Sequence, residues 1–258
     1  MSSYNGLQVS LHHPMSHGLQ IDVNYTFSKS FDFGSDAERV GPNGGTSAIL
    51  DTWKPYLNKA VSDFDTAQLL TANLVDELPL GKGRTFLAKA GPITNALIGG
   101  WQFSRILRVT SGLSLSFFEP GYTTDWQAES SPVVADNSVK AKKYLDTNSD
   151  PQYFTNPTSI NQGIYNGTPI RLPYAGEAGE RNKFRGDAYF DIDSGLSKTW
   201  IVSRHGALKL SWEVYNVSNS VRFDPFSINT ELTSGTLGVA SSELTSPRRM
   251  QFALRYDF

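Results

Sequence analysis

The sequence predicts an all-β fold in which antiparallel strands follow one another up and down along a single sheet. Three observations predict it. Apolar and polar residues alternate in several segments, short and long connections alternate between those segments, and no apolar run is long enough for a membrane-spanning helix. Alternation indicates strands because successive side chains of a strand point to opposite faces of the sheet. An amphipathic helix would need apolar residues three and four positions apart.

The first two strands are predicted to form a hairpin. Leu7, Val9 and Leu11 alternate with polar residues, and the segment Pro14–Gly18 has the composition of a turn. Strict alternation then continues through residues 19–28, for about ten residues, which is the length with which a tilted strand crosses a bilayer. The second strand is therefore long enough to span a membrane.

Further alternating segments complete a predicted set of seven strands. They are residues 66–80, 101–115, 188–200, 207–217 and 248–258. A short helical turn is expected near residues 93–98. Residues 118–186 are expected to be irregular, because they contain prolines, turn sequences and scattered aromatic residues. The chain ends on an alternating apolar set, which consists of Met250, Phe252, Leu254, Tyr256 and Phe258.

The predicted connections sort by length. Short and long links alternate along the chain, so the short links lie at one end of the sheet and the long links at the other. This is the pattern of an outer-membrane β-barrel, which has short periplasmic turns and long extracellular loops. A soluble β-sandwich that binds a small ligand is the alternative, although such a fold has no reason to separate its loops by length.

The composition excludes several kinds of site. The chain has 258 residues, no cysteine and a formal net charge of −2. It therefore has no disulfide, no thiolate metal site, no cysteine nucleophile and no general attraction to nucleic acid. The residues after Met1 lack the basic and apolar regions of a signal peptide. The mean hydropathy, −0.33, is typical of a soluble protein, but a membrane barrel exposes only alternate residues of each strand to lipid.

Aromatic residues are expected at both rims of the sheet, as an aromatic girdle in a membrane barrel requires. The expected periplasmic girdle consists of Trp101, Trp200, Tyr256 and Phe258, and Tyr25 and Phe27 are expected at the opposite rim. Arg105 lies on an apolar face, where an arginine costs about 2–4 kcal/mol at the membrane midplane and almost nothing at the interface. Its side chain either extends to the headgroups or is turned inward by a β-bulge.

Several polar motifs have both a functional and a structural interpretation. His12, His13 and His17 cluster around the first turn, and solvated turn residues are favoured over a metal site because no regularly spaced carboxylate completes the set. Asp191 and Asp193 share a strand face, and an inward polar lining is favoured over acid–base catalysis. The tripeptide Arg185–Asp187, RGD, is too short to indicate adhesion.

The long loops carry many aromatic residues, which suit either ligand capture or packing of each loop against itself. They are Trp53, Tyr56, Tyr122, Trp126, Tyr144, Tyr153, Phe154, Tyr165 and Tyr174. No substrate-binding residue is assigned among them.

Six segments, in order along the chain, resemble the C-terminal barrel of TonB-dependent outer-membrane receptors. More narrowly, they resemble the Oar-like group, whose members carry an N-terminal carboxypeptidase-regulatory-like domain. The segments are YNGLQVSL…SHGLQIDVNYTFSKSFD, SDFD…ELPLGKG, LIGGWQFSRILRVTSGLSLSF, GEAGERNKFRGDAYFDIDSGLSKTW, LSWEVYNVSNSVRF and PRRMQFALRYDF.

The resemblance implies that residues 1–258 are the C-terminal part of such a barrel, roughly the last seven of about 22 strands. We expect the plug, the TonB box and the signal peptide to be absent, so that the chain is a fragment or a truncated gene product. Because seven strands cannot close an antiparallel barrel, we also expect the chain alone not to form a stable pore.

The resemblance also implies a function and partners. The parent protein would sit in the bacterial outer membrane and move a bulky nutrient with energy passed by TonB, which would act through the missing N-terminal region. This chain would supply barrel wall and extracellular loops, with no catalytic role and no cofactor. Outer-membrane lipid and the barrel-assembly machinery are the expected partners, and the final apolar set ending at Phe258 resembles the signal read by that machinery. A structural or adhesion protein without transport is the alternative.

Overall fold

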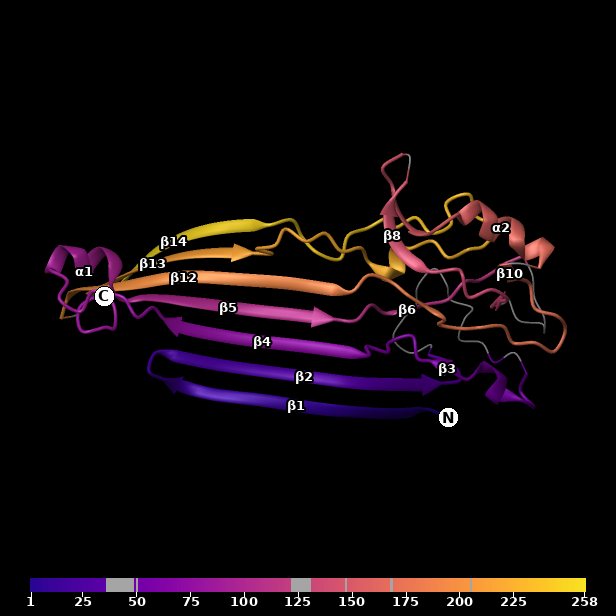
Figure 1. Ribbon diagram of the computed structural model, residues 1–258, viewed down its shortest axis with the longest axis horizontal. Helices are drawn as coiled ribbons and strands as arrows, with labels where there is room; N and C mark the ends of the chain where they lie inside the picture. Colours follow the sequence, from indigo (N-terminus) through magenta and orange to yellow (C-terminus); the bar gives the residue numbers. More distant parts are fainter. Residues whose placement is uncertain (36–48, 50, 122–130, 147, 168, 205) are drawn as a thin grey trace.

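Seven long antiparallel strands form one sheet, in which each strand pairs with its neighbours along the chain (Figure 1). The computed structural model describes residues 1–35, 49, 51–121, 131–146, 148–167, 169–204 and 206–258. The strands are β1 (Ser3–Ser16), β2 (Leu19–Asp32), β4 (Gln68–Glu77), β5 (Trp101–Thr110), β12 (Tyr189–Ser203), β13 (Gly206–Tyr215) and β14 (Arg249–Asp257), with β3 (Ala60–Val61) paired to the end of β2. The seven predicted strands and their up-and-down order are confirmed.

The two ends of the sheet differ as the loop lengths predict. At one end, which we call the turn end, His17–Gly18 joins β1 to β2, and β12 turns into β13 between Ser203 and Gly206. The connection from β4 to β5 also lies there and carries α1 (Pro92–Ile98), which confirms the expected helical turn. The opposite end, the loop end, holds the long connections 33–67, 111–188 and 216–248 (Figure 1).

The second long connection contains more regular structure than the sequence predicts. Its short strands pair as β6 with β11, β7 with β10 and β8 with β9. They are β6 (Ser114–Leu115), β7 (Val133–Val134), β8 (Ala141–Leu145), β9 (Pro151–Phe154), β10 (Ile170–Arg171) and β11 (Phe184–Arg185); the helices of the long connections are α2 (Pro157–Asn166), η2 (Pro55–Asn58) and η3 (Pro225–Ser227). Strands of this length are too short to show a periodic pattern. Within the described residues, no helix is long and apolar enough to cross a membrane.

The two faces of the sheet differ in polarity, since paired residues on neighbouring strands share a face. One row of the polar face consists of Ser10, Asn24, Thr71, Arg108 and Asp191. The adjacent row of the apolar face consists of Val9, Tyr25, Leu70, Val109 and Phe190. The period-two pattern of the sequence therefore becomes one apolar and one polar surface.

Apart from α1, which lies against the apolar face at the turn end, no other part of the chain that the structure describes covers this face. Every buried hydrophobic side chain of the described residues lies in the long connections, and none belongs to the seven long strands. On β14, Phe252 is 72% exposed and Leu254 is 67% exposed. A soluble β-sandwich would bury one face of each strand against a second sheet. The soluble-sandwich alternative is therefore wrong.

Two predicted element boundaries are also wrong. The first turn is shorter than predicted, because β1 continues through Pro14 with a register shift between His13 and Ser16. Pro14 is tolerated there because β1 is an edge strand. The turn itself has positive φ at His17 (53°) and Gly18 (87°), as a tight hairpin of type I′ requires. The predicted break after Trp200 is absent, since β12 continues to Ser203.

The direction of the edge strands limits how the sheet can close. β1 and β14 are the two edges, and the pairings between them are all antiparallel. An odd number of strands therefore makes β1 and β14 run in the same direction. An antiparallel barrel cannot close by pairing β14 with β1, either within one copy or between two copies in the same orientation.

We predict that residues 1–258, refolded alone in detergent, do not give a closed barrel. Unpaired backbone N–H and C=O groups along both edge strands cost several kcal/mol each in lipid. The isolated sheet is therefore expected to unfold or aggregate. The measurement is gel mobility with and without heating. A detergent-resistant monomer whose mobility changes on heating would contradict this prediction.

Candidate functional site: the loop cap and the faces of the sheet

The described residues of the second and third long connections fold together into one unit at the loop end, which we call the loop cap (residues 111–121, 131–146, 148–167, 169–188 and 216–248). Its hydrophobic core is built on three phenylalanines. The ring centroid of Phe117 lies 4.6 Å from that of Phe154 and 5.0 Å from that of Phe184. Their buried neighbours are Leu115, Tyr153, Ile160, Ile164, Ile170, Ile228, Leu232, Leu237 and Ala240. Long loops with a shared core hold their surfaces in a fixed arrangement.

Hydrogen bonds join the two connections of the loop cap across this core. The Tyr153 amide donates to the Gly238 carbonyl at 2.9 Å, and the side-chain amide of Gln152 donates to the Leu237 carbonyl at 2.8 Å. Asp187 adds an ionic link, since its carboxylate accepts from Lys143 at 2.8 Å and lies 3.6 Å from Arg222. Contacts between the second and third long connections therefore hold both of them in place.

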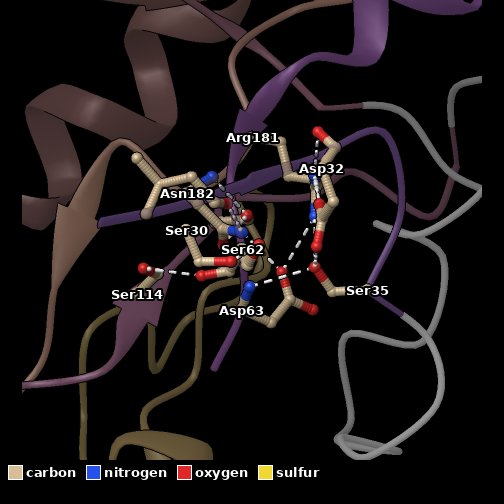
Figure 2. A network of polar contacts seen from close by, with 10 residues as sticks. Ser30, Asp32, Ser35, Ser62, Asp63, Ser114, Arg181 and Asn182 are labelled. Carbon is tan, nitrogen blue, oxygen red and sulfur yellow. Dashed lines mark hydrogen bonds and ion pairs between the residues drawn. The ribbon is translucent and has the colours of Figure 1, made fainter. Parts of the chain in front are cut away.

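A buried polar junction attaches the first long connection to the loop cap (Figure 2). The Arg181 guanidinium donates to Asp63 Oδ1 at 3.1 Å, to Ser35 Oγ at 3.1 Å and to the carboxylate of Asp32. Asn182 donates from its side chain to the Val61 carbonyl at 2.7 Å and to the Asp63 carboxylate. The side chain of Arg181 is 4% exposed and that of Asp32 is 7% exposed, so the charges are compensated by one another rather than by water.

Arg185 extends the junction toward the end of β2. Its guanidinium donates to the Asp65 carboxylate and, at 2.9 Å each, to the carbonyls of Asp65 and Gly112. Asp65 in turn accepts from the Ser30 amide at 2.7 Å. The RGD tripeptide thus lies within internal contacts, since Asp187 is the ionic link of the loop cap. Both halves of the junction come from segments that carry the family resemblance, SDFD and GERNKFRGD.

The loop aromatics divide into two groups. Tyr153 and Phe154 pack in the core of the loop cap, and burial raises the pKa of the Tyr153 hydroxyl. The exposed group consists of Trp53 (92%), Tyr56 (60%), Tyr165 (72%), Tyr174 (68%) and Tyr144 (36%). Tyr122 and Trp126 lie outside the described residues. Only the exposed group is placed to contact a ligand.

The polar face carries a hollow of about 330 Å³ over Gly195. Small side chains and ionisable groups of both signs line it. The lining includes Ser104, Gly195, Ser211, Asp193, Lys209 and Glu213. A Cβ at Gly195 would approach Ser104 Oγ to 2.7 Å, so glycine keeps the centre open. The hollow therefore presents hydrogen-bond donors and acceptors that can pair with polar groups of a ligand or of another protein segment.

Asp191 and Asp193 lie on the polar face, as predicted. Asp193 Oδ1 accepts from the Asn216 amide at 2.9 Å, and Asp191 Oδ2 accepts from the Tyr189 hydroxyl at 3.2 Å. The three histidines do not converge. His12 contacts Asp22 on the polar face, His13 pairs with Ile21 on the apolar face, and His17 lies in the turn. Among the described residues, no group of three histidine or acidic residues is arranged to hold a metal ion.

Residues of the predicted girdle meet at the turn end. The rings of Trp101 and Trp200 are 6.4 Å apart in an edge-to-face arrangement, and those of Tyr256 and Phe258 are 6.2 Å apart and stacked. Leu208 pairs with both Trp200 and Tyr256, which places these two aromatics in one row. Phe27 lies toward the loop end of β2. Tyr25 is near the middle of β2, so it does not lie at the end of that strand, and the function of these aromatics as a girdle stays a prediction.

The predicted assembly set lies on one face of the edge strand β14. Met250, Phe252, Leu254, Tyr256 and Phe258 are all more than half exposed. Trp212 of β13 stacks on Phe252 with ring centroids 5.8 Å apart. Recognition of this set by the barrel-assembly machinery stays a prediction.

Arg105 remains on the apolar face. It pairs with Leu74 and Ser194 in an uninterrupted register, so the β-bulge alternative is wrong. Its guanidinium lies 5.2 Å from the ring centroid of Phe103, which is two residues nearer the turn end. The side chain therefore points toward that rim, as the headgroup alternative requires.

Sequence reasoning missed two groups of residues. The first is the junction of Arg181 and Asn182 with Asp63, whose partners are far apart in the chain and give no local signal. The second is Lys198, which lies on the apolar face between Leu196 and Trp200 and is 4% exposed. The sequence does contain a signal for Lys198, because the alternating pattern of residues 188–200 places this lysine on the same strand face as Leu196 and Trp200.

We predict that Arg181→Ala loosens the first long connection from the loop cap. Removing one partner of a buried ion pair costs about 3–5 kcal/mol, because it leaves the other charge uncompensated. The measurement is amide hydrogen exchange at Ser30 and Asn182 in the membrane-bound protein. Lys183→Ala is the matched control, since the Lys183–Glu180 pair is over a third exposed on both sides. Equal exchange in both variants would contradict the prediction.

We predict that the Glu177 carboxyl stays ionised well into acid. Two hydrogen bonds from Arg171, at 2.7 and 2.9 Å, and one from the Tyr174 amide lower the pKa of Glu177 from 4.5 to about 2. Because the folded pKa is lowered, the contact stabilises the loop above pH 4.5 and is lost as the pH falls toward 2. The measurement is an NMR titration of this carboxyl with Glu177→Gln as the assignment control. A midpoint near 4.5 would show that the Arg171 contact does not form.

The comparisons with known proteins agree with the fold. The family model described as "Outer membrane beta barrel domain" matches residues 1–251. No curated protein and no solved structure matches the chain. The family model covers all of the sheet except most of β14, and a barrel in a membrane accounts for the exposed apolar face. The chain therefore belongs to the outer membrane beta barrel domain family.

Proposed function

We propose that this chain is part of the wall and extracellular surface of a TonB-dependent outer-membrane transporter of the Oar-like group. The family establishes the outer-membrane barrel domain and points to the bacterial outer membrane. The finer assignment rests on the resemblance of the six sequence segments. In this proposal the apolar face contacts lipid, the polar face lines the lumen, and the loop cap faces the outside.

The observation that carries the proposal is the loop cap itself. A barrel that serves only as a membrane anchor has no need of ordered loops, whereas capture of a ligand requires surfaces held in place. The buried junction around Arg181 and the phenylalanine core supply that order. Tyr165 and Tyr174 stay exposed on the loop cap, and Trp53 and Tyr56 stay exposed on the first long connection that the junction attaches to it. Aromatic side chains contribute large contact areas in binding.

The polar face of the sheet is suited to line a lumen that contains a protein segment or a ligand as well as water. The hollow over Gly195 presents Asp193, Glu213 and Lys209, which can hydrogen-bond the polar surface of a protein segment or a passing ligand. The direction of β1 and β14 requires an odd number of further strands for closure, as a larger barrel supplies. We assign the chain no catalytic role and no cofactor, and its partners in this proposal are lipid, the barrel-assembly machinery and TonB.

The second candidate is an adhesion or structural protein of the outer membrane without transport. The same exposed aromatics favour it, because a fixed aromatic surface binds a neighbouring cell or polymer as readily as a solute. The two functions differ in whether energy from TonB is used.

We predict that the parent protein that contains this chain cross-links to TonB, through its N-terminal region, in the outer membrane of the cells that make it. An affinity tag inserted after Asn148, in the exposed turn between β8 and β9, leaves both the loop cap core and the sheet intact. Formaldehyde treatment should then give an adduct that contains TonB and disappears in a strain without TonB. A correctly inserted, surface-exposed protein that gives no adduct would favour adhesion over transport.

A further inference from the structure

One connection at the turn end is longer than its neighbours. β1 and β2 are joined tightly at His17–Gly18, and β12 and β13 are joined between Ser203 and Gly206. Residues 78–100, which we call the rim segment, instead form a loop followed by α1. Figure 1 shows the rim segment beside the C-terminus at this end of the sheet.

Side chains of the apolar face hold α1 by its last carbonyl groups. The last carbonyls of a helix have few internal partners, although the Gly99 amide donates to Asn95 O at 3.0 Å, and a cation near them also interacts favourably with the helix dipole. The contacts are Trp101 Nε1 to Leu97 O (2.9 Å), Trp200 Nε1 to Ala96 O (2.7 Å), Lys198 Nζ to Asn95 O (3.2 Å) and Lys198 Nζ to Gly99 O. Because all three donors are on the apolar face, α1 lies over that face.

The outer side of the rim segment is apolar and exposed. Ile93 and Leu97 are one helical turn apart and therefore share a face of α1. The exposed apolar side chains are Phe86 (58%), Leu87 (51%), Ile93 (79%), Leu97 (66%) and Ile98 (40%). Since α1 is attached to the apolar face of the sheet, this patch continues the surface that the membrane covers.

The charge of the rim segment has one sign. Residues 78–100 contain Lys82, Arg84 and Lys89 and no aspartate or glutamate. All three basic residues are exposed, and Arg84 also reaches Glu77 of β4 at 2.7 Å. A short amphipathic segment with exposed apolar residues and only positive charges matches the boundary between acyl chains and anionic headgroups.

We propose that the rim segment is an interfacial anchor that binds anionic phospholipid in the periplasmic leaflet of the outer membrane. Ile93 and Leu97 enter the boundary of the acyl chains, and Lys82 and Lys89 contact phosphate groups. Lys198, Trp101 and Trp200 position the anchor on the barrel wall. The proposal rests on the membrane placement of the sheet, and it assigns an additional lipid contact to a segment that is not part of a spanning strand.

The test uses the protein in the outer membranes of the cells that make it. An apolar carbene-generating photolabel partitions into the acyl chains, and mass spectrometry locates the residues that it modifies. We expect modification of Phe252 and Leu254 on β14 and also of Ile93 and Leu97. The exposed loop aromatics Tyr165 and Tyr174 should stay unmodified, because they lie in the loop cap.

The outcomes separate the anchor from the membrane placement. Labelling of β14 without labelling of α1 would overturn the anchor alone and indicate a water-exposed or protein-covered rim segment. Labelling of neither would overturn the membrane placement and the anchor together.

A charge variant tests the headgroup contact. In the double variant Lys82→Gln/Lys89→Gln, the ratio of α1 labelling to β14 labelling should fall, because attraction to anionic headgroups is removed. The matched control is Lys140→Gln/Lys142→Gln, which removes two exposed lysines at the loop end and should leave the ratio unchanged. An equal ratio in both variants would overturn the assignment of anionic lipid as the partner.

Discussion

The structure depends on one constraint: the sheet has an apolar face that, apart from α1 at the turn end, no described part of the chain covers. Alternation places most of the apolar side chains of seven strands on this face and most of their polar neighbours on the other, with Arg105 and Lys198 as exceptions on the apolar face. Hydrophobic burial at about 25 cal/mol per Å² would be lost over the whole face if it met water. A lipid environment removes that cost. Lipid offers no hydrogen bonds to the backbone, so the strands must satisfy their N–H and C=O groups by pairing with one another.

A second constraint acts at the loop end, which lies outside the lipid. There, as in a soluble protein, apolar side chains must be buried and buried charges must be paired. There the buried hydrophobic residues collect into one core around Phe154, and buried charges are paired at Arg181. The chain therefore contains two differently solvated parts. In the sheet, apolar residues face outward, whereas in the loop cap they face inward, and the polar junction joins the first loop to the cap at the border between the parts.

The sequence predicts the sheet well because a period of two is a local signal that seven segments repeat. The same alternation places Arg105 on the apolar face, and loop lengths predict which ends of the strands lie together. Three features escape this reasoning. Pro14 looked like the start of a turn, but an edge strand tolerates it. The short pairs of residues 111–188 carry no periodic signal. The junction joins Asp63 to Arg181 over more than a hundred residues, so only tertiary structure reveals it.

The most direct test of the account is the environment of each residue of β14 in the membrane-bound protein. The chain has no cysteine, so single cysteines can be placed from Arg249 to Asp257 and given a spin label. Access to oxygen, which concentrates in lipid, should peak at Met250, Phe252, Leu254 and Tyr256. Access to a water-soluble nickel chelate should peak at the residues between them. Equal access to the chelate at all these positions would contradict a sheet whose apolar face is covered by lipid.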